Sequence, residues 1–156
     1  MTHPAQSESE LLKIFFDSDL CQRATQPLKN GIEIAIHLPD HTPFTLIKTQ
    51  GKISIQENTP KAPDMSFWIG NKGVRELTAL KTEDIGAIGI TIIKLMLAED
   101  PDLRLKSKVH IGTFQLITHG YLSVLPLGGT TVMKFLATKG FSSIGKIKDA
   151  ISHLRG

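Results

Sequence analysis

The chain has 156 residues, of which 40% are hydrophobic, and a single domain of this size buries a substantial core without disulfide bonds. Its single cysteine, Cys21, excludes an internal disulfide framework. The first thirty residues contain four carboxylates where a signal peptide has a basic start and an apolar core, so we expect a soluble, cytoplasmic protein. We expect residues 1–156 to form one domain, with residues 1–6 frayed.

Charge is divided unevenly along the chain. Residues 1–102 carry 10 Lys and Arg against 14 Asp and Glu, whereas residues 103–156 carry 8 against the single Asp149. This basic C-terminal third predicts transient contact with an anionic membrane surface, the other interpretation being an ordinary solvated surface. We expect no nucleic-acid binding, because stacking on bases needs exposed aromatic rings interleaved with the lysines, and the few aromatics here fall in apolar registers.

The N-terminal half predicts a helix followed by strands. Ser7 and Glu10 form a capping-box pattern that opens a helix with one apolar stripe, which Pro27 and Asn30 would end. Apolar residues then recur with a period of two, and this period predicts strands over 32–38, 44–49, 53–56 and 65–69. The short connections between these strands predict an antiparallel meander.

The C-terminal half predicts helices around one further strand. A helix is expected from Asn71 through Leu80, and a second, very apolar helix over 85–98. Residues 108–118 have strand character with a bulge at Gly112, and residues 121–127 form another apolar run. The last two helices are expected to begin near Thr130 and Ser142.

The segment 85–98 is apolar in nearly every direction around a helix, so it is either buried or spans a membrane. Fourteen residues reach only about 21 Å, short of the roughly 30 Å hydrocarbon layer of a bilayer. The helix therefore needs cover from its own domain, or one side of it faces a cavity for an apolar ligand. Gly86 and Gly89 are spaced i, i+3 and leave one face almost without side chains.

A local pattern then resembles the sterol-carrier-protein-2-like (SCP2) lipid-transfer family. It consists of Gly51 to Ile55, then Ala62-Pro63-Asp64-Met65-Ser66-Phe67-Trp68-Ile69, and then Val74-Arg75-Glu76-Leu77. The resemblance implies an α+β fold, with about five mostly antiparallel strands and helices packed on one face to enclose an apolar cavity. It also implies non-catalytic binding or transfer of a fatty acyl chain, sterol, phospholipid or isoprenoid quinone.

The resemblance places the cavity lining on the fourth strand and on the apolar helix that follows. The candidate positions there are Phe67, Ile69, Ile85, Gly89, Ile92, Ile93 and Met96. To these we add Phe114 and Leu116 from the expected later strand, and Met133 and Phe135 from the penultimate helix. Each of these residues is also an ordinary core residue; together they exceed what one small sheet needs for cover.

The sequence predicts no enzyme, no cofactor and no metal site. His37 and His41 are separated by the Pro39 turn, and no carboxylate or cysteine follows them in ligand register. Cys21 has no evident base beside it, and neither a serine-hydrolase elbow nor a phosphate-binding loop occurs. The alternative function is a protein-interaction or accessory module, for example in quinone biosynthesis, that acts through its apolar surface as a homodimer.

Overall fold

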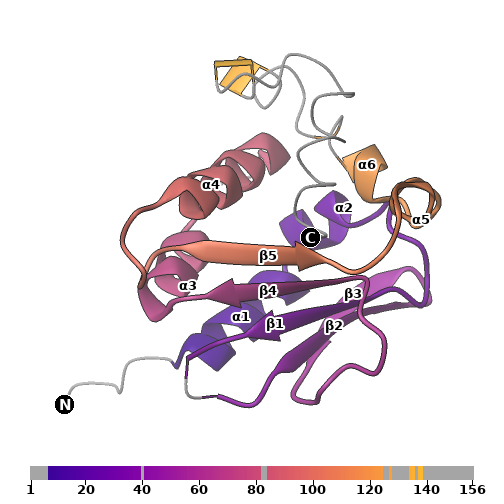
Figure 1. The fold of residues 1–156 in the computed structure, drawn as a ribbon, viewed down its shortest axis with the longest axis horizontal. Coiled ribbons are helices and arrows are strands. Elements are labelled where there is room, and N and C mark those ends of the chain that lie inside the picture. The colour runs from indigo at the N-terminus through magenta and orange to yellow at the C-terminus, as the bar shows by residue number, and fades with distance from the viewer. Residues whose placement is uncertain are drawn as a thin grey trace.

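Figure 1 shows the protein, a computed structural model that describes residues 7–39, 41–81, 84–124, 127, 134–135 and 137–138. A five-stranded sheet carries helices that pack against it. The elements in chain order are α1 Glu8–Asp17, α2 Asp19–Ala24, β1 Glu33–His37, β2 Phe44–Thr49, β3 Lys52–Gln56, β4 Met65–Ile69, α3 Asn71–Thr78, α4 Ile85–Leu97, β5 Leu105–Val109, α5 Thr113–Thr118 and α6 Tyr121–Val124.

The sheet has the strand order β3-β2-β1-β4-β5, and three of its four pairings are antiparallel. The exception is β4, which runs parallel to β1 with Ala35 opposite Ser66. The predicted four-strand meander is therefore wrong for its last strand. A short link joins β3 to β4, but these strands are not neighbours; β1 and β4 are neighbours, and the connection between them contains all of β2 and β3.

The link between β3 and β4 passes β2 and β1, so that β4 pairs with the edge of β1 opposite to β2. Its start is held where the Thr45 hydroxyl donates to the Asn58 carbonyl at 2.8 Å. Its end is held where the Asp64 N–H donates to the Glu33 carbonyl at 2.8 Å. These long-range contacts decide the strand order, and no local turn pattern encodes them.

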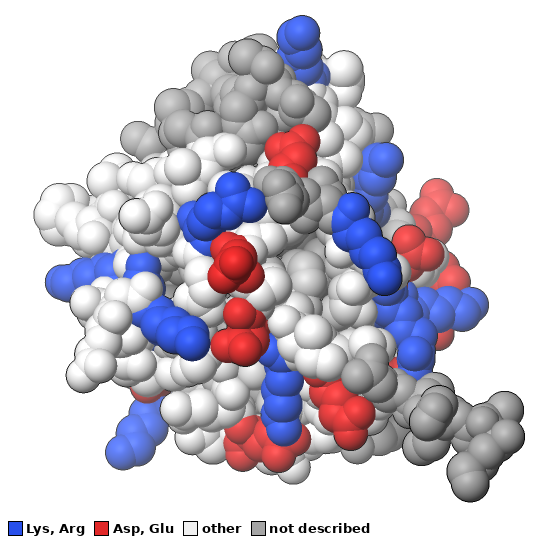
Figure 2. All heavy atoms as spheres, turned by 180° about the vertical axis from the view of Figure 1, so that it is seen from behind, with Lys and Arg blue, Asp and Glu red and all other residues white. Residues whose placement is uncertain are grey.

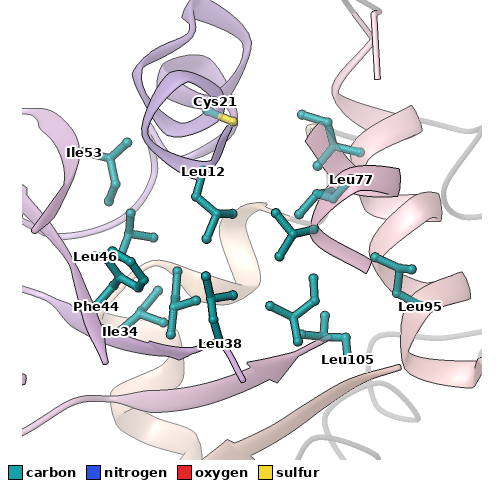
Figure 3. Close-up of a cluster of buried hydrophobic side chains, with 14 of the residues drawn as sticks. Leu12, Cys21, Ile34, Leu38, Phe44, Leu46, Ile53, Leu77, Leu95 and Leu105 are labelled. Carbon is teal, nitrogen blue, oxygen red and sulfur yellow. The ribbon is translucent and has the colours of Figure 1, made fainter. Parts of the chain in front are cut away.

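The core lies on the helix-covered face of the sheet. Alternate strand residues point to this face, among them Ile34, Leu46 and Leu105, and they meet Leu12 of α1, Leu77 of α3 and Leu95 of α4 (Figure 3). Phe44 and Val74 are completely buried in this cluster. The predicted fold class, α+β with a mostly antiparallel five-stranded sheet and helices packed on one face, is confirmed.

The predicted N-terminal helix is divided in two. Ser18 has extended backbone angles, φ −67° and ψ 152°, and ends α1. Its hydroxyl donates to the Phe15 carbonyl at 2.6 Å and accepts from the Cys21 N–H at 3.3 Å, so one serine caps both helices. The continuous helix up to Pro27 was therefore a wrong prediction, because α2 turns to follow the sheet.

The expected strand over 108–118 is also wrong. Strand β5 begins earlier, at Leu105, and ends at Val109, and the remainder forms the helix α5. Gly112 is the residue before this helix and not a bulge; its N–H donates to the Gln115 side chain at 3.2 Å. A six-residue helix is too short to show a period of 3.6, so Phe114 and Leu116 imitated strand alternation.

The apolar run 121–127 begins with the short helix α6. Lys134, Phe135, Ala137 and Thr138 are helical, whereas the remainder of the two terminal helices predicted from the sequence lies outside the described residues. Helix α4 forms as predicted, and the Asp84 carboxylate caps it by accepting from the Gly86 N–H at 2.9 Å. Among the described residues no helix combines the length and apolarity that crossing a bilayer requires.

Candidate functional site

An apolar cavity of about 300 Å³ lies between the sheet and the helices α1, α2, α4 and α6. Protein sites for small molecules commonly measure about 300–1,000 Å³, so the cavity is large enough for a ligand. Its described lining comprises Phe15, Phe16, Cys21, Ala24, Thr25, Leu28, Ile34, Met65, Phe67, Leu77, Ile85, Ile88, Gly89, Ile92, Tyr121 and Val124.

A second cavity of about 140 Å³ adjoins the first and reaches toward Ile69 and Leu105. The two cavities share the side chains of Phe16, Phe67 and Leu77 as walls. An apolar cavity of about 150 Å³ in other proteins stays dry and accepts small apolar molecules. The two spaces therefore lie side by side with aromatic side chains between them.

Polar atoms in the lining of the larger cavity are engaged within the protein. The Thr25 hydroxyl donates to the Cys21 carbonyl at 2.7 Å, and the Tyr121 hydroxyl donates to Asp64 Oδ2 at 2.9 Å. Burial raises the pKa of the Cys21 thiol to about 11, opposed in part by its hydrogen bond with Ser18, so the thiol stays neutral at physiological pH. The cavity thus presents an uncharged surface without a free hydrogen-bonding group from these three residues.

Helix α4 turns one stripe toward the cavity. Ile85, Ile88, Gly89 and Ile92 follow the i, i+3, i+4, i+7 spacing of a single helix face, and all four line the larger cavity. Gly89 has no side chain, so the space in front of this turn of the helix stays open. An apparently uniform apolar helix therefore has a distinct inner face.

Five of the predicted lining residues border a cavity. Phe67, Ile85, Gly89 and Ile92 line the larger cavity, and Phe67, Ile69 and Ile92 line the smaller one.

The other predicted positions lie elsewhere. Ile93 and Met96 are half-buried on α4 without lining either cavity, and Met96 packs against the core cluster. Phe114 is 77% exposed on α5, and Leu116 is buried away from both cavities. The Phe135 ring lies 6.0 Å from Lys94 Nζ, and Met133 lies outside the described residues.

Sequence reasoning missed two parts of the lining. Phe15 and Phe16 of α1 form a wall, with their rings 5.3 Å apart in an edge-to-face contact. Their place in the apolar stripe of α1 predicted burial but gave no sign of a cavity. Tyr121 and Val124 of α6 were also missed, because the apolar run 121–127 gave no sign that its side chains approach α2 and α4.

Three polar side chains fix α6 beside the cavity. The buried Asp64 carboxylate contacts the His119 Nδ1 atom at 2.7 Å and accepts from the Tyr121 hydroxyl at 2.9 Å. Burial and the negative charge of Asp64 raise the pKa of Tyr121 well above its ordinary value, so its hydroxyl remains a donor. Asp64, at the start of β4, thereby holds the wall residue Tyr121 in place.

Helix α2 is fixed to the sheet by a buried lysine. Lys48 Nζ donates to the carbonyl oxygens of Thr25 and Gln26 at 2.9 and 2.7 Å, at the C-terminal end of α2. Both residues directly follow α2, and the helix dipole makes a cation favourable at the C-terminal end of a helix. Burial lowers the pKa of Lys48, and the two hydrogen bonds stabilise its charged form. Thr25 is thus held as a wall of the cavity.

The described residues assemble no catalytic triad. Ser66 Oγ lies 2.8 Å from His110 Nε2, but the carboxylate of Asp64 contacts a different histidine, His119. A nucleophile, base and orienting carboxylate must act through the same imidazole. His37 stacks on Trp68 with ring centroids 4.9 Å apart, and burial lowers its pKa. Within the described part of the chain, no three His, Cys, Asp or Glu side chains gather as metal ligands.

Comparison with solved structures finds structural similarity. The chain is similar to a solved structure described as "UbiJ-SCP2 Ubiquinone synthesis protein", with a TM-score of 0.42 and 14% sequence identity. The match covers 80% of this chain and 86% of that chain. No protein-family model and no curated protein matches the sequence.

Proposed function

We propose that the protein binds an apolar, lipid-like molecule without chemical conversion, in the cavity between the sheet and α4. The observation that carries this proposal is the cavity of about 300 Å³, which is lined almost entirely by apolar side chains. An apolar space with no polar partner to offer excludes water and favours hydrocarbon. Fatty acyl chains, sterols, phospholipid tails and isoprenoid quinones share this chemistry.

The energetics of burial support such a ligand. Each methylene group removed from water contributes about 0.8 kcal/mol, so a chain of ten methylenes gains on the order of 8 kcal/mol before the costs of immobilisation. The aromatic walls Phe16 and Phe67 offer large, adaptable contact surfaces, and Met65 adds a flexible one. Affinity would thus come from apolar area, and selectivity from the length and shape of the cavity.

Extraction of the purified protein with organic solvent, followed by mass spectrometry, tests this function directly. We expect a bound apolar molecule, and we expect an emptied protein to take up a fluorescent fatty-acid analogue in titration. Cys21 lines the cavity and is the single cysteine, so its alkylation reports occupancy.

At pH 8, a pKa of about 11 leaves roughly one Cys21 thiol in a thousand ionised. Alkylation of the folded protein should therefore be slow, faster at pH 10 than at pH 8, and slower still when ligand fills the cavity. A protein that carries no apolar molecule, ignores the probe and shows no ligand protection of Cys21 would contradict the proposal.

The second candidate is a protein-interaction module that acts as a dimer. Large apolar side chains are exposed away from the cavity, with Ile14 and Leu97 each 58% exposed. Light scattering separates the candidates, because a tight dimer that never takes up the probe supports only the interaction module.

A further inference from the structure

Helix α5 exposes two large apolar side chains on one side. Phe114 is 77% exposed and Ile117 is 45% exposed, and their i, i+3 spacing places them next to each other. Between them in sequence, Leu116 is buried and holds the opposite side of the helix against the domain. We refer to Phe114 and Ile117 together as the α5 apolar pair.

The α5 apolar pair stands on a firmly anchored segment. The His119 side chain contacts Asp64, and its carbonyl accepts from the Lys29 N–H at 2.9 Å. Gly120, with φ +92°, then turns the chain so closely past Pro27 that a Cβ atom would overlap the Pro27 carbonyl oxygen. The two apolar side chains are therefore held exposed to solvent by a fixed backbone. Exposing this apolar surface to water is unfavourable, and folding does not require it.

The chain around α5 is free of negative charge. No Asp or Glu occurs between residues 103 and 148, whereas Arg104, Lys106 and Lys108 precede α5 on or beside β5. Lys106 and Lys108 are exposed. The Asp64 carboxylate near the end of α5 is buried and engaged with His119 and Tyr121. On the face shown in Figure 2, by contrast, acidic and basic side chains are interspersed.

The cleft beside His119 adds further cations. Lys29 and Lys61 border this cleft together with the half-buried Glu33, whose carboxylate accepts from the Ala62 N–H at 3.4 Å. An apolar pair with lysines beside it and few carboxylates near it complements an anionic lipid surface, where the apolar side chains enter the acyl boundary and the ammonium groups meet the head groups.

The position of α5 connects this surface to the cavity. Only His119 and Gly120 separate it from α6, whose Tyr121 and Val124 line the cavity wall. A membrane in contact with the α5 apolar pair would lie directly beside the helix that forms that wall.

We propose that the α5 apolar pair is a docking surface for an anionic membrane, placed to bring the cavity wall to the bilayer. The inference rests on the proposed lipid binding for its purpose, but the contact itself is independent of cavity occupancy. The α5 apolar pair lies within the basic C-terminal third, for which the sequence predicts contact with an anionic membrane surface.

Co-sedimentation with lipid vesicles tests the docking surface. The wild type is mixed with vesicles of phosphatidylcholine alone or of phosphatidylcholine with 30% phosphatidylglycerol, at low and at high salt. We expect at least tenfold stronger partitioning onto the anionic vesicles, falling steeply with salt. The double variant Phe114→Gln, Ile117→Gln should lose at least tenfold of that binding, whereas Ile14→Gln, which alters an equally exposed residue of α1, should change it less than twofold.

Two outcomes would overturn the docking surface. One is equal binding of the wild type to neutral and anionic vesicles; the other is a double variant that binds as the wild type does. If light scattering shows that the double variant converts a dimer into a monomer while vesicle binding is absent throughout, the pair joins two copies of the chain and the proposal is wrong. Uptake of a fluorescent fatty-acid analogue without vesicles should be unchanged in the double variant, so failure of docking and failure of cavity binding are distinguishable.

Discussion

Helices α3 and α4 cover the same sheet in opposite ways. Helix α3 is the more polar of the two, yet Gly73, Val74 and Leu77 pack it tightly, and its first turn contacts the 100–103 loop directly through the Gly73 N–H, 3.1 Å from the Asp102 carbonyl. Helix α4 is almost wholly apolar, yet of its thirteen residues only Gly86, Ile88 and Leu95 are fully buried.

The difference shows that apolarity and tight packing are separate properties. A narrow apolar stripe with a small residue lets α3 approach the Leu103 backbone closely at Gly73, while Leu77 on the same helix borders both cavities. The broad apolar surface of α4 must be shielded from water on several sides, and one side of the helix borders the cavity. The glycines of the two helices differ in the same way, because Gly73 lies against the Leu103 backbone and Gly89 lines the larger cavity.

Adding a methyl group at the packed glycine should have the largest effect. In Gly73→Ala, the new Cβ would lie 2.6 Å from the Leu103 carbonyl oxygen and 2.8 Å from Ile69 Cγ1, and the backbone atom has no room to move. We expect a loss of about 3 kcal/mol in the free energy of unfolding, measured by urea denaturation. Glu76→Ala, an exposed position on the same helix, should stay within about 0.5 kcal/mol. A stable Gly73→Ala protein would show that α3 is as loosely packed as α4.

Adding a larger side chain at the cavity glycine should change binding and not folding. In Gly89→Leu, the side chain would fill space that is now open, and leucine favours the helix over glycine by about 0.8 kcal/mol. We expect unchanged or slightly higher stability with at least a tenfold loss of fatty-acid affinity, about 1.4 kcal/mol. Lys94→Leu, at an exposed position of α4, is the matched control and should bind normally. Unchanged affinity in Gly89→Leu would make α4 a core helix only.

Replacing an apolar residue at the end of α4 should have the smallest effect. Leu97 is 58% exposed, so Leu97→Gln removes little buried surface. We expect the free energy of unfolding to change by less than about 0.5 kcal/mol and Tm by less than about 2 °C, measured by thermal denaturation. A loss above about 1 kcal/mol would mean that Leu97 is covered in solution, which would favour the dimeric interaction module.

Helices and strands could be predicted from the sequence where the residues of one short segment determine them. The Ser7 cap, the alternation in β1 to β3 and the composition of α4 each predicted an element that the structure contains. Cavity residues on β4 and α4, such as Phe67 and Ile92, were also found, because apolar positions on those elements have few other places to face. The two helices within residues 113–124 were not predicted, because they are too short to show a helical period of apolar residues.

The sequence by itself determined the fold class, most helix and strand positions, and the need of α4 for cover, because hydrophobic period and capping act over a few residues. Only the tertiary structure decided that β4 pairs with β1 in parallel, that Tyr121 is held against Asp64, and that a cavity remains under α4. Strand order and cavity walls depend on contacts between residues far apart in the chain, here as many as 57 positions for Asp64 and Tyr121. Such contacts arise from packing the whole chain, and no short segment records them.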